Sequence, residues 1–167
     1  REMRRTSARS EMLFLNVLSV MAKVLEAKDP YARFHSENVS TLASTTAREM
    51  GLADDEVRRI GIAGILHDLG KLEVSRKILY KAAQLTQDEK HEMEGHVNKE
   101  IFDPIRGPLG RIIPLILGHH DRFDGSGYHP NGGEDIPLGT RILAIADVYD
   151  AMTSDPVLTG RPCPHLK

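Results

Sequence analysis

The chain contains no tryptophan and a single cysteine, and none of its apolar runs reaches the length that a membrane-spanning helix needs. One cysteine, Cys163, excludes an internal disulfide framework and is typical of a reducing compartment. We therefore expect a cytoplasmic protein, or the cytoplasmic portion of a larger or membrane-attached sensor. The formal net charge of −2 gives no bulk attraction to polyanions, so a nucleic acid polymer is not an expected partner.

The 167 residues and their 40% hydrophobic content suit one domain. Apolar residues recur at helical spacing along nearly the whole chain, which predicts an all-α fold. Within residues 1–28, six apolar residues should form one face of a helix. That helix either packs on the domain or continues a helix from an upstream sensor domain. The six residues are Leu13, Val17, Val20, Met21, Val24 and Leu25.

Helix boundaries are predicted from capping and breaking residues. Asp29 and Pro30 are typical of a helix start, and Gly51 of the following stop. Thr86 followed by Glu89 is typical of a capping box, which opens another helix. The helices predicted in this way cover residues 29–50, 54–69, 86–102, 107–120 and 137–152.

The remaining segments are expected to lack long helices. Residues 71–85 show no sustained periodicity and predict a loop with short turns. Residues 121–136 contain four glycines and one proline and predict a long Gly-rich loop before the last main helix. Residues 156–167 resemble a C-terminal tail, either truncated or non-native, which leaves residues 29–155 as the expected functional domain.

The pair His67-Asp68 ends an apolar helical stretch and is followed closely by Lys71. Burying such groups costs free energy unless something compensates them. A metal ion is one compensator, because neutral imidazole and ionised carboxylate are its natural ligands. A helix end capped by a His–Asp hydrogen bond is the alternative, and the pair alone does not decide between them.

Other histidines and an aspartate lie in or beside apolar stretches on separate predicted helices. Helical bundles build metal sites in this way, from side chains that project inward from facing helices. The set exceeds the four ligands of a closed zinc site and suits two divalent ions that share a carboxylate. Its mixed chemistry favours Fe or Mn, with Zn and Ni as alternatives. The seven candidates are His35, His67, Asp68, His96, His119, His120 and Asp147.

Several motifs resemble, in order, those of the HD-GYP subgroup of HD-domain metal-dependent phosphohydrolases. Residues 67–71 (HDLGK) resemble the HDxGK signature, and residues 119–128 (HHDRFDGSGY) resemble the HHExxDGxGYP segment. The match continues through residues 136–139, 141–143 and 146–155, and residues 28–31 and 35–37 also fit. The resemblance covers about residues 25–155 and implies an HD-domain helical bundle.

This resemblance also implies an activity, which is hydrolysis of cyclic di-GMP to pGpG, and further to GMP, in bacterial signalling. By analogy, one ion is held by His35, His67, Asp68 and Asp147. Asp68 bridges to a second ion, which His96, His119 and His120 complete. Lys71 contacts the scissile phosphate or the attacking hydroxide and stabilises developing negative charge, whereas its structural alternative is a cation at a helix C-terminus.

The Gly-rich loop is associated in the family with shaping the site and with partner contacts. The residues concerned here are Asp124, Gly125, Gly127 and Tyr128. The resemblance therefore implies a GGDEF-type or other signalling protein as a partner. An upstream sensor domain and a homodimer are further expectations.

Three positions depart from the family pattern. Tyr31 stands where some members have a glutamate that binds a third ion, so two ions are expected. His129 separates Tyr128 from Pro130 in the Gly-Tyr-Pro motif, and we expect His129 to be exposed rather than a ligand. The arginine that usually follows Asp155 is missing, which predicts weaker substrate binding.

Two other functions compete with the phosphodiesterase. A catalytically weak sensor or interaction module would fold, bind metal and signal through the Gly-rich loop. An HD phosphohydrolase acting on another nucleotide, such as a dNTP or an alarmone, is the second alternative.

Overall fold

The computed structural model describes residues 2–26, 34–81, 83–130 and 132–153, and these residues form helices, turns and loops without a strand. The all-α prediction is confirmed. The four longest helices are α1 (Glu2–Glu26), α2 (His35–Glu49), α3 (Asp54–Leu66) and α9 (Leu138–Thr153). The shorter ones are α4 (Arg76–Leu79), α5 (Gln87–Glu94), α6 (Lys99–Phe102), α7 (Arg106–Leu109) and α8 (Ile113–Leu117), with 3₁₀ segments η1 (Leu69–Glu73), η2 (Gly95–Val97), η3 (Asp103–Ile105) and η4 (Gly133–Asp135).

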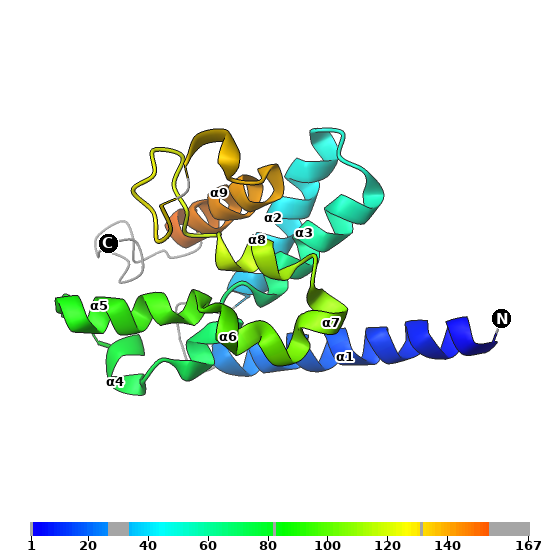
Figure 1. Ribbon diagram of the computed structural model, residues 1–167, viewed down its shortest axis with the longest axis horizontal. Helices are drawn as coiled ribbons and strands as arrows, with labels where there is room; N and C mark the ends of the chain where they lie inside the picture. Colours follow the sequence, from blue (N-terminus) through cyan, green and yellow to red (C-terminus); the bar gives the residue numbers. More distant parts are fainter. Residues whose placement is uncertain (1, 27–33, 82, 131, 154–167) are drawn as a thin grey trace.

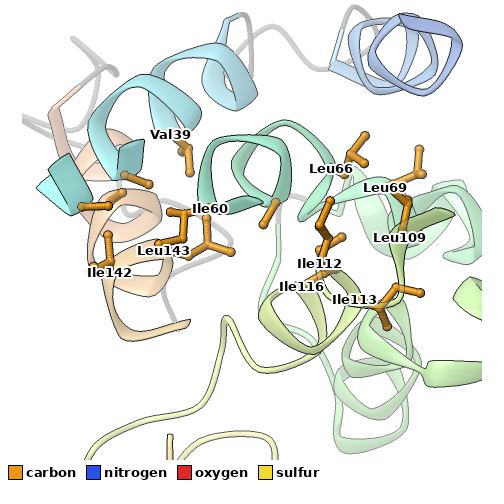
Figure 2. Close-up of a cluster of buried hydrophobic side chains, with 14 of the residues drawn as sticks. Val39, Ile60, Leu66, Leu69, Leu109, Ile112, Ile113, Ile116, Ile142 and Leu143 are labelled. Carbon is orange, nitrogen blue, oxygen red and sulfur yellow. The ribbon is translucent and has the colours of Figure 1, made fainter. Parts of the chain in front are cut away.

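The helices divide into two groups around α3 (Figure 1). Helices α2, α3, α8 and α9 pack against one another, and α1 runs along the opposite edge beneath α6 and α7. Buried side chains fill the space between the helices, with Val39, Ile60 and Leu143 together on one side of α3 (Figure 2). Leu66 and Ile116 lie in the other part of the same core, so α3 is the central element that both parts share.

The capping box predicted at Thr86 is present. The backbone N–H of Glu89 donates to the Thr86 hydroxyl over 3.4 Å, and the backbone N–H of Thr86 donates to the Glu89 carboxylate over 2.8 Å. The prediction that this helix reaches residue 102 is wrong. Helix α5 ends at Glu94, and Asn98 caps the next helix by accepting from the backbone N–H of Glu100 over 3.1 Å. The break places His96 in a short 3₁₀ turn.

The helix predicted over residues 107–120 is also broken. Helix α7 ends at Leu109, and α8 covers only Ile113–Leu117, so His119 and His120 lie in the turn that follows α8. Pro114 lies at the start of α8, where its missing N–H costs nothing. Helix α3 likewise ends earlier than predicted, at Leu66, which puts Asp68 at the entry to η1.

Other boundaries agree with the sequence. Helix α2 ends at Glu49, one residue before the predicted end at Met50. Helix α9 differs by one residue at each end from the predicted range 137–152. Residues 71–85 hold only short elements where the structure describes them. The helix predicted over residues 29–50 is shorter, because α2 begins at His35 and the preceding Phe34 has a left-handed φ of 68°. The start predicted at Asp29-Pro30, the position of Tyr31 and the tail 156–167 lie outside the described residues.

The first predicted helix is present as α1, and the sequence left its packing open. Among the described side chains of α1, Leu18, Ala22 and Glu26 are buried, with exposed fractions of 6%, 4% and 9%. Leu13 and Val17, on the predicted apolar face, are 65% and 51% exposed. The segment carries apolar residues on two faces, so periodicity alone could not say which face meets the core. Within the described residues, no helix has both the length and the apolar character that crossing a bilayer requires.

Candidate metal centre

All seven predicted ligands converge in one place, from five separate parts of the chain. Histidine rings form a continuous series, in which the ring centroids of His35 and His67 are 5.2 Å apart and those of His67 and His119 are 5.1 Å apart. The centroids of His96 and His120 are 5.1 Å apart, and those of His119 and His120 are 3.9 Å apart. Asp68 and Asp147 border the same series.

Three groups of these side chains have ligand atoms close enough together to hold a metal ion. Within each group the ligand atoms lie within 4.8 Å of one another. His67 belongs to two of the groups, and His119 also belongs to two, so the groups adjoin one another. They are His35, His67 and Asp147; His67, Asp68 and His119; and His96, His119 and His120.

The most buried histidines all have the same hydrogen-bond arrangement. The side chains of His67, His96 and His119 are almost fully buried. Each Nδ1 bonds to the backbone carbonyl three residues earlier, over 2.8 Å, 2.6 Å and 2.6 Å respectively. A carbonyl oxygen can only accept, so each Nδ1 must carry the hydrogen. In its neutral form, a ring anchored in this way presents an Nε2 lone pair.

Those lone pairs have no protein partner among the described residues. His67 Nε2, His96 Nε2, His119 Nε2 and one carboxylate oxygen of Asp68 are buried without a hydrogen bond. Leaving a buried polar atom unpaired costs about 1–3 kcal/mol each, and four such atoms occur together. A divalent cation would satisfy all of them, and backbone-anchored Nδ1 groups are the usual second shell of metal-binding histidines. The residues present therefore fit a metal ion.

His35 completes the cluster on the side of α9. Its Nε2 lies 3.0 Å from Asp147 Oδ1, and Asp147 Oδ1 lies 3.6 Å from His67 Nε2. On the other edge of the ring, Nδ1 bonds to Asp150 Oδ2 over 2.7 Å. Asp150 is buried and was missed by the sequence analysis. Its signal was its place on the same helix, three residues after Asp147, where the two carboxylates reach the two nitrogens of one ring.

Asp68 lies between the two ends of the cluster. Its Oδ2 is 3.5 Å from His67 Nε2, and its Oδ1 is 4.0 Å from His96 Nε2. Lys71 Nζ donates to Asp68 Oδ2 over 2.6 Å, and the side chain of Lys71 is only 14% exposed. The cation of Lys71 is therefore held at the cluster rather than in solvent.

The local electrostatics separate neutral from charged members of the cluster. Burial, together with neighbouring histidines, lowers the pKa of His120 to about 4 and that of His119 well below its usual value. Burial also lowers the pKa of His96. Asp68 keeps its negative charge, because Lys71 and the nearby imidazoles lower its pKa in spite of its burial. The site thus offers neutral imidazoles beside ionised carboxylates, which is what a divalent ion binds.

His35 differs from the other histidines. Burial disfavours its charged form, but hydrogen bonds with Asp147 and Asp150 more than offset this and raise the pKa of His35 to about 10. The same hydrogen bond keeps the pKa of Asp147 below its usual range, although burial acts against this. In the absence of a metal, His35 is therefore protonated at neutral pH.

Gly70 has a steric role in holding the cluster together. A Cβ at this position would lie 1.8 Å from the backbone oxygen of His96, so no other residue fits without backbone movement. The glycine lets η1 and η2 approach closely, and this approach brings Asp68 and His96 to the same site. The glycine of the HDxGK motif therefore has a packing reason in this chain.

The Gly-rich loop folds back over the histidine pair. A Cβ at Gly127 would lie 2.5 Å from the backbone oxygen of His120, so the loop backbone lies directly against the turn after α8. The ring of Tyr128 packs on the ring of His120, with centroids 4.7 Å apart. Asp124 instead accepts hydrogen bonds from Ser126, which lower its pKa to about 2, and its side chain is 60% exposed.

Asp121 anchors this loop, and sequence reasoning missed it. Its side chain is 6% exposed, and its Oδ1 accepts from the backbone N–H of His129 over 3.2 Å and lies 2.8 Å from His129 Nδ1. His129, the residue that interrupts the Gly-Tyr-Pro motif, is thus a loop contact with a 40% exposed side chain and not one of the grouped metal-binding candidates. Its bond to Asp121 fixes the residue next to Tyr128.

Comparison with known proteins shows the family to which the chain belongs. The family model of the HD domain matches residues 19–164 of the chain, and the chain belongs to this family. The chain is 40% identical to a cyclic di-GMP phosphodiesterase response regulator of Xanthomonas campestris pv. campestris over 142 residues, which are 82% of this chain and 37% of the relative.

Two further relatives have related names. A cyclic di-GMP phosphodiesterase of Pseudomonas aeruginosa is 40% identical over 138 residues, which cover 78% of the chain and 32% of the relative. A 3'3'-cGAMP-specific phosphodiesterase of Vibrio cholerae is 33% identical over 143 residues, which cover 83% of the chain and 31% of the relative. The chain thus spans about a third of the length of these curated relatives.

Proposed function

We propose that this chain is the hydrolytic domain of a cyclic dinucleotide phosphodiesterase, which opens cyclic di-GMP to pGpG and cleaves it further to GMP. The observation that supports this most strongly is the convergence of three buried Nε2 atoms and a carboxylate oxygen without protein partners. The names of the relatives supply the substrate class, because they are cyclic di-GMP or 3'3'-cGAMP phosphodiesterases.

Two divalent ions would occupy the cluster. His35, His67 and Asp147 would hold one of them, and His96, His119 and His120 would hold the other. Asp68 lies between these groups and would contribute an oxygen to each ion. Fe or Mn suits this mixture of imidazole and carboxylate, with Zn and Ni as alternatives. When bound, two such ions polarise a phosphoryl oxygen and activate water for attack on phosphorus.

The chain's own residues would prepare this chemistry in three ways. The carbonyl-anchored Nδ1 groups of His67, His96 and His119 hold the rings in one orientation, so the lone pairs are aligned before any ligand arrives. Lys71 places a cation where negative charge develops on the phosphate. Tyr128 packs on His120 and would offer an aromatic surface to a bound nucleotide.

The decisive experiment combines metal analysis with a product assay. Protein purified anaerobically would be loaded with Fe or Mn and incubated with cyclic di-GMP, and pGpG and GMP would be separated by chromatography. We expect about two metal ions per chain and formation of pGpG. A panel of 3'3'-cGAMP, dNTPs and an alarmone would establish the substrate. Metal binding without turnover of any of these would instead identify a sensor or interaction module.

The same hypothesis includes three further proposals. The Gly-rich loop would contact a GGDEF-type signalling protein, the chain would be attached to an upstream sensor domain, and the protein would lie in the cytoplasm. The exposure of Phe123 and Asp124 on the loop supports such a contact. A binding assay with the loop variant Phe123→Ala, whose side chain is 61% exposed, would test the partner contact. Unchanged binding by that variant would place the partner elsewhere.

A further inference from the structure

The first turn of α2 begins without a capping side chain of its own. Phe34 precedes the helix, and its side chain has no oxygen that could accept from the free backbone N–H groups of the first turn. Its left-handed φ is also a conformation that bulky residues rarely adopt, so the surrounding structure must hold it. The start of α2 therefore needs support from another part of the chain, and the first residue of this helix is the candidate ligand His35.

Glu26, the last residue of α1, supplies such support. Its Oε1 accepts from the backbone N–H of Ser36 over 2.6 Å in a buried contact. A carboxylate at the C-terminal end of its own helix is electrostatically unfavourable, so the stability of α1 does not explain this burial. At the N-terminal end of α2, the same carboxylate satisfies an unpaired donor and interacts favourably with the helix dipole. Glu26 thus caps α2 although it belongs to α1.

The cap acts on the part of α2 that holds the His35 ring, because Ser36 directly follows His35. The Nε2 of His35 lies 3.0 Å from Asp147 Oδ1, and its Nδ1 bonds to Asp150 Oδ2 over 2.7 Å. Both carboxylates come from α9, so the ring keeps these distances only while the first turn of α2 is wound. An uncapped first turn frays. Fraying would move His35 away from His67 and Asp147, the other members of its metal-binding group.

We propose that Glu26 is a positioning residue for the metal centre, because it holds His35 in place by capping α2 from α1. This inference rests on the metal centre of the proposed function and not on the identity of the substrate. Glu26 does not belong to any of the metal-binding groups, and its Oε1 is engaged by Ser36. Its influence should therefore be confined to the ion that His35 holds.

Lys23 provides the matched control. It forms a second contact between the same two helices, because its Nζ lies 2.6 Å from Glu37 Oε1. The side chains of this pair are 58% and 44% exposed, and exposed ion pairs contribute little to stability. Lys23→Ala thus removes a contact between α1 and α2 and leaves the cap of Glu26 in place.

Amide hydrogen exchange in the metal-free protein measures the cap directly. Glu26→Ala should accelerate exchange at Ser36 about tenfold, because the N–H loses a buried, charged acceptor. Glu26→Gln should retain most of the protection, since its amide oxygen can still accept. Glu26→Asp keeps the charge but is one methylene shorter, so it should behave like Glu26→Ala and replaces that variant if it does not fold. Unchanged exchange in Glu26→Ala, or equal loss in Glu26→Gln, would overturn the cap.

Mn²⁺ binding measures the effect on His35. In a His120→Ala background, which impairs the other ion site, Glu26→Ala should weaken Mn²⁺ binding about tenfold. In an Asp147→Ala background, which impairs the site of His35, it should change the affinity less than about twofold. Lys23→Ala should change neither affinity. Equal weakening in both backgrounds would identify a general loss of stability and overturn the positioning role, and weakening in neither would overturn it as well.

Neither measurement involves a nucleotide, so the two proposals can fail separately. A protein that gives the expected exchange and Mn²⁺ affinities but hydrolyses no cyclic dinucleotide would contradict the proposed function alone. A protein that hydrolyses cyclic di-GMP with equal Mn²⁺ affinity in Glu26→Ala and the wild type would contradict the positioning role alone.

Discussion

The proton held by His35 leads to a quantitative prediction about metal binding. The pKa of about 10 means that almost every His35 ring is protonated at pH 7. A protonated imidazole has no free lone pair, so a metal ion must displace the proton from Nε2. Asp150 would keep the hydrogen on Nδ1. The first ion should therefore release about one proton from this residue.

A proton and the metal ion compete for Nε2 of His35, and this competition determines how the metal affinity depends on pH. The raised pKa of His35 makes the proton win at low pH, so metal affinity should rise with pH until about pH 10. One displaced proton gives a tenfold change per pH unit. Between pH 6 and pH 8, the affinity of the metal-free protein for its first Mn²⁺ should increase about a hundredfold. His120, with a pKa of about 4, contributes no such dependence over this range.

Isothermal titration calorimetry in buffers of different ionisation enthalpy measures both the number of protons released and the metal affinity at each pH. Water bound to the ion also loses a proton, with a pKa near 7 in some sites. An ordinary histidine is also largely protonated at pH 6, so the difference in count between the wild type and Asp150→Asn at pH 8 is the more specific test of His35. Asp150→Asn should lower the count at pH 8, because it removes a charge that raises the pKa of His35. A count near zero at pH 6, or an affinity independent of pH, would refute the reasoning.

The remaining predictions concern single residues. Asp68→Ala should lose bound metal and activity together, measured by metal analysis and pGpG formation, whereas near-normal turnover would exclude Asp68 as the shared ligand. Lys71→Ala should retain metal but lower the rate about a hundredfold, as removal of a charge-stabilising group does, and loss of metal would assign it a structural role. Gly70→Ala should destabilise the fold by about 1–3 kcal/mol or more in thermal unfolding, because of its contact with the His96 backbone, while Gly95→Ala, with open space around it, should not. Asp121→Ala should raise KM more than it lowers kcat, because the loop would lose its anchor, and Asp121→Asn should restore much of this if the hydrogen bond matters more than the charge.

Much of the site could be predicted from the sequence, because the ligands are chemically conspicuous. Histidines and aspartates next to apolar residues needed an explanation, and the order of the motifs supplied one. Asp150 could not be recognised in the same way. Its role depends on which face of α9 meets His35, and a carboxylate near a helix end is ordinarily solvated. Asp121 was missed for a similar reason, since its partner His129 lies across a folded loop.

The fold was predictable as a class but not in its packing. Periodicity identified α1, but its two apolar sides gave no basis for choosing the one that meets the domain, and Leu13 and Val17 lie on the exposed side. Contacts with α3 and η1 decide the matter, and these form only in the folded chain. The pattern was therefore interpreted correctly as one face of a helix, and the sequence left open what that face contacts.

The errors in helix length have a common physical cause, and it is connected with function. His67, His96 and His119 all lie at or just beyond the end of a helical segment, where backbone carbonyls no longer have an N–H partner four residues later. Each ring donates to one of those carbonyls. The side chain thereby caps its helix and orients its own lone pair. The breaks after α5 and α8, which propensity failed to predict, set the positions of His96 and His119, and with them the positions of the unpaired Nε2 atoms that form the candidate metal centre.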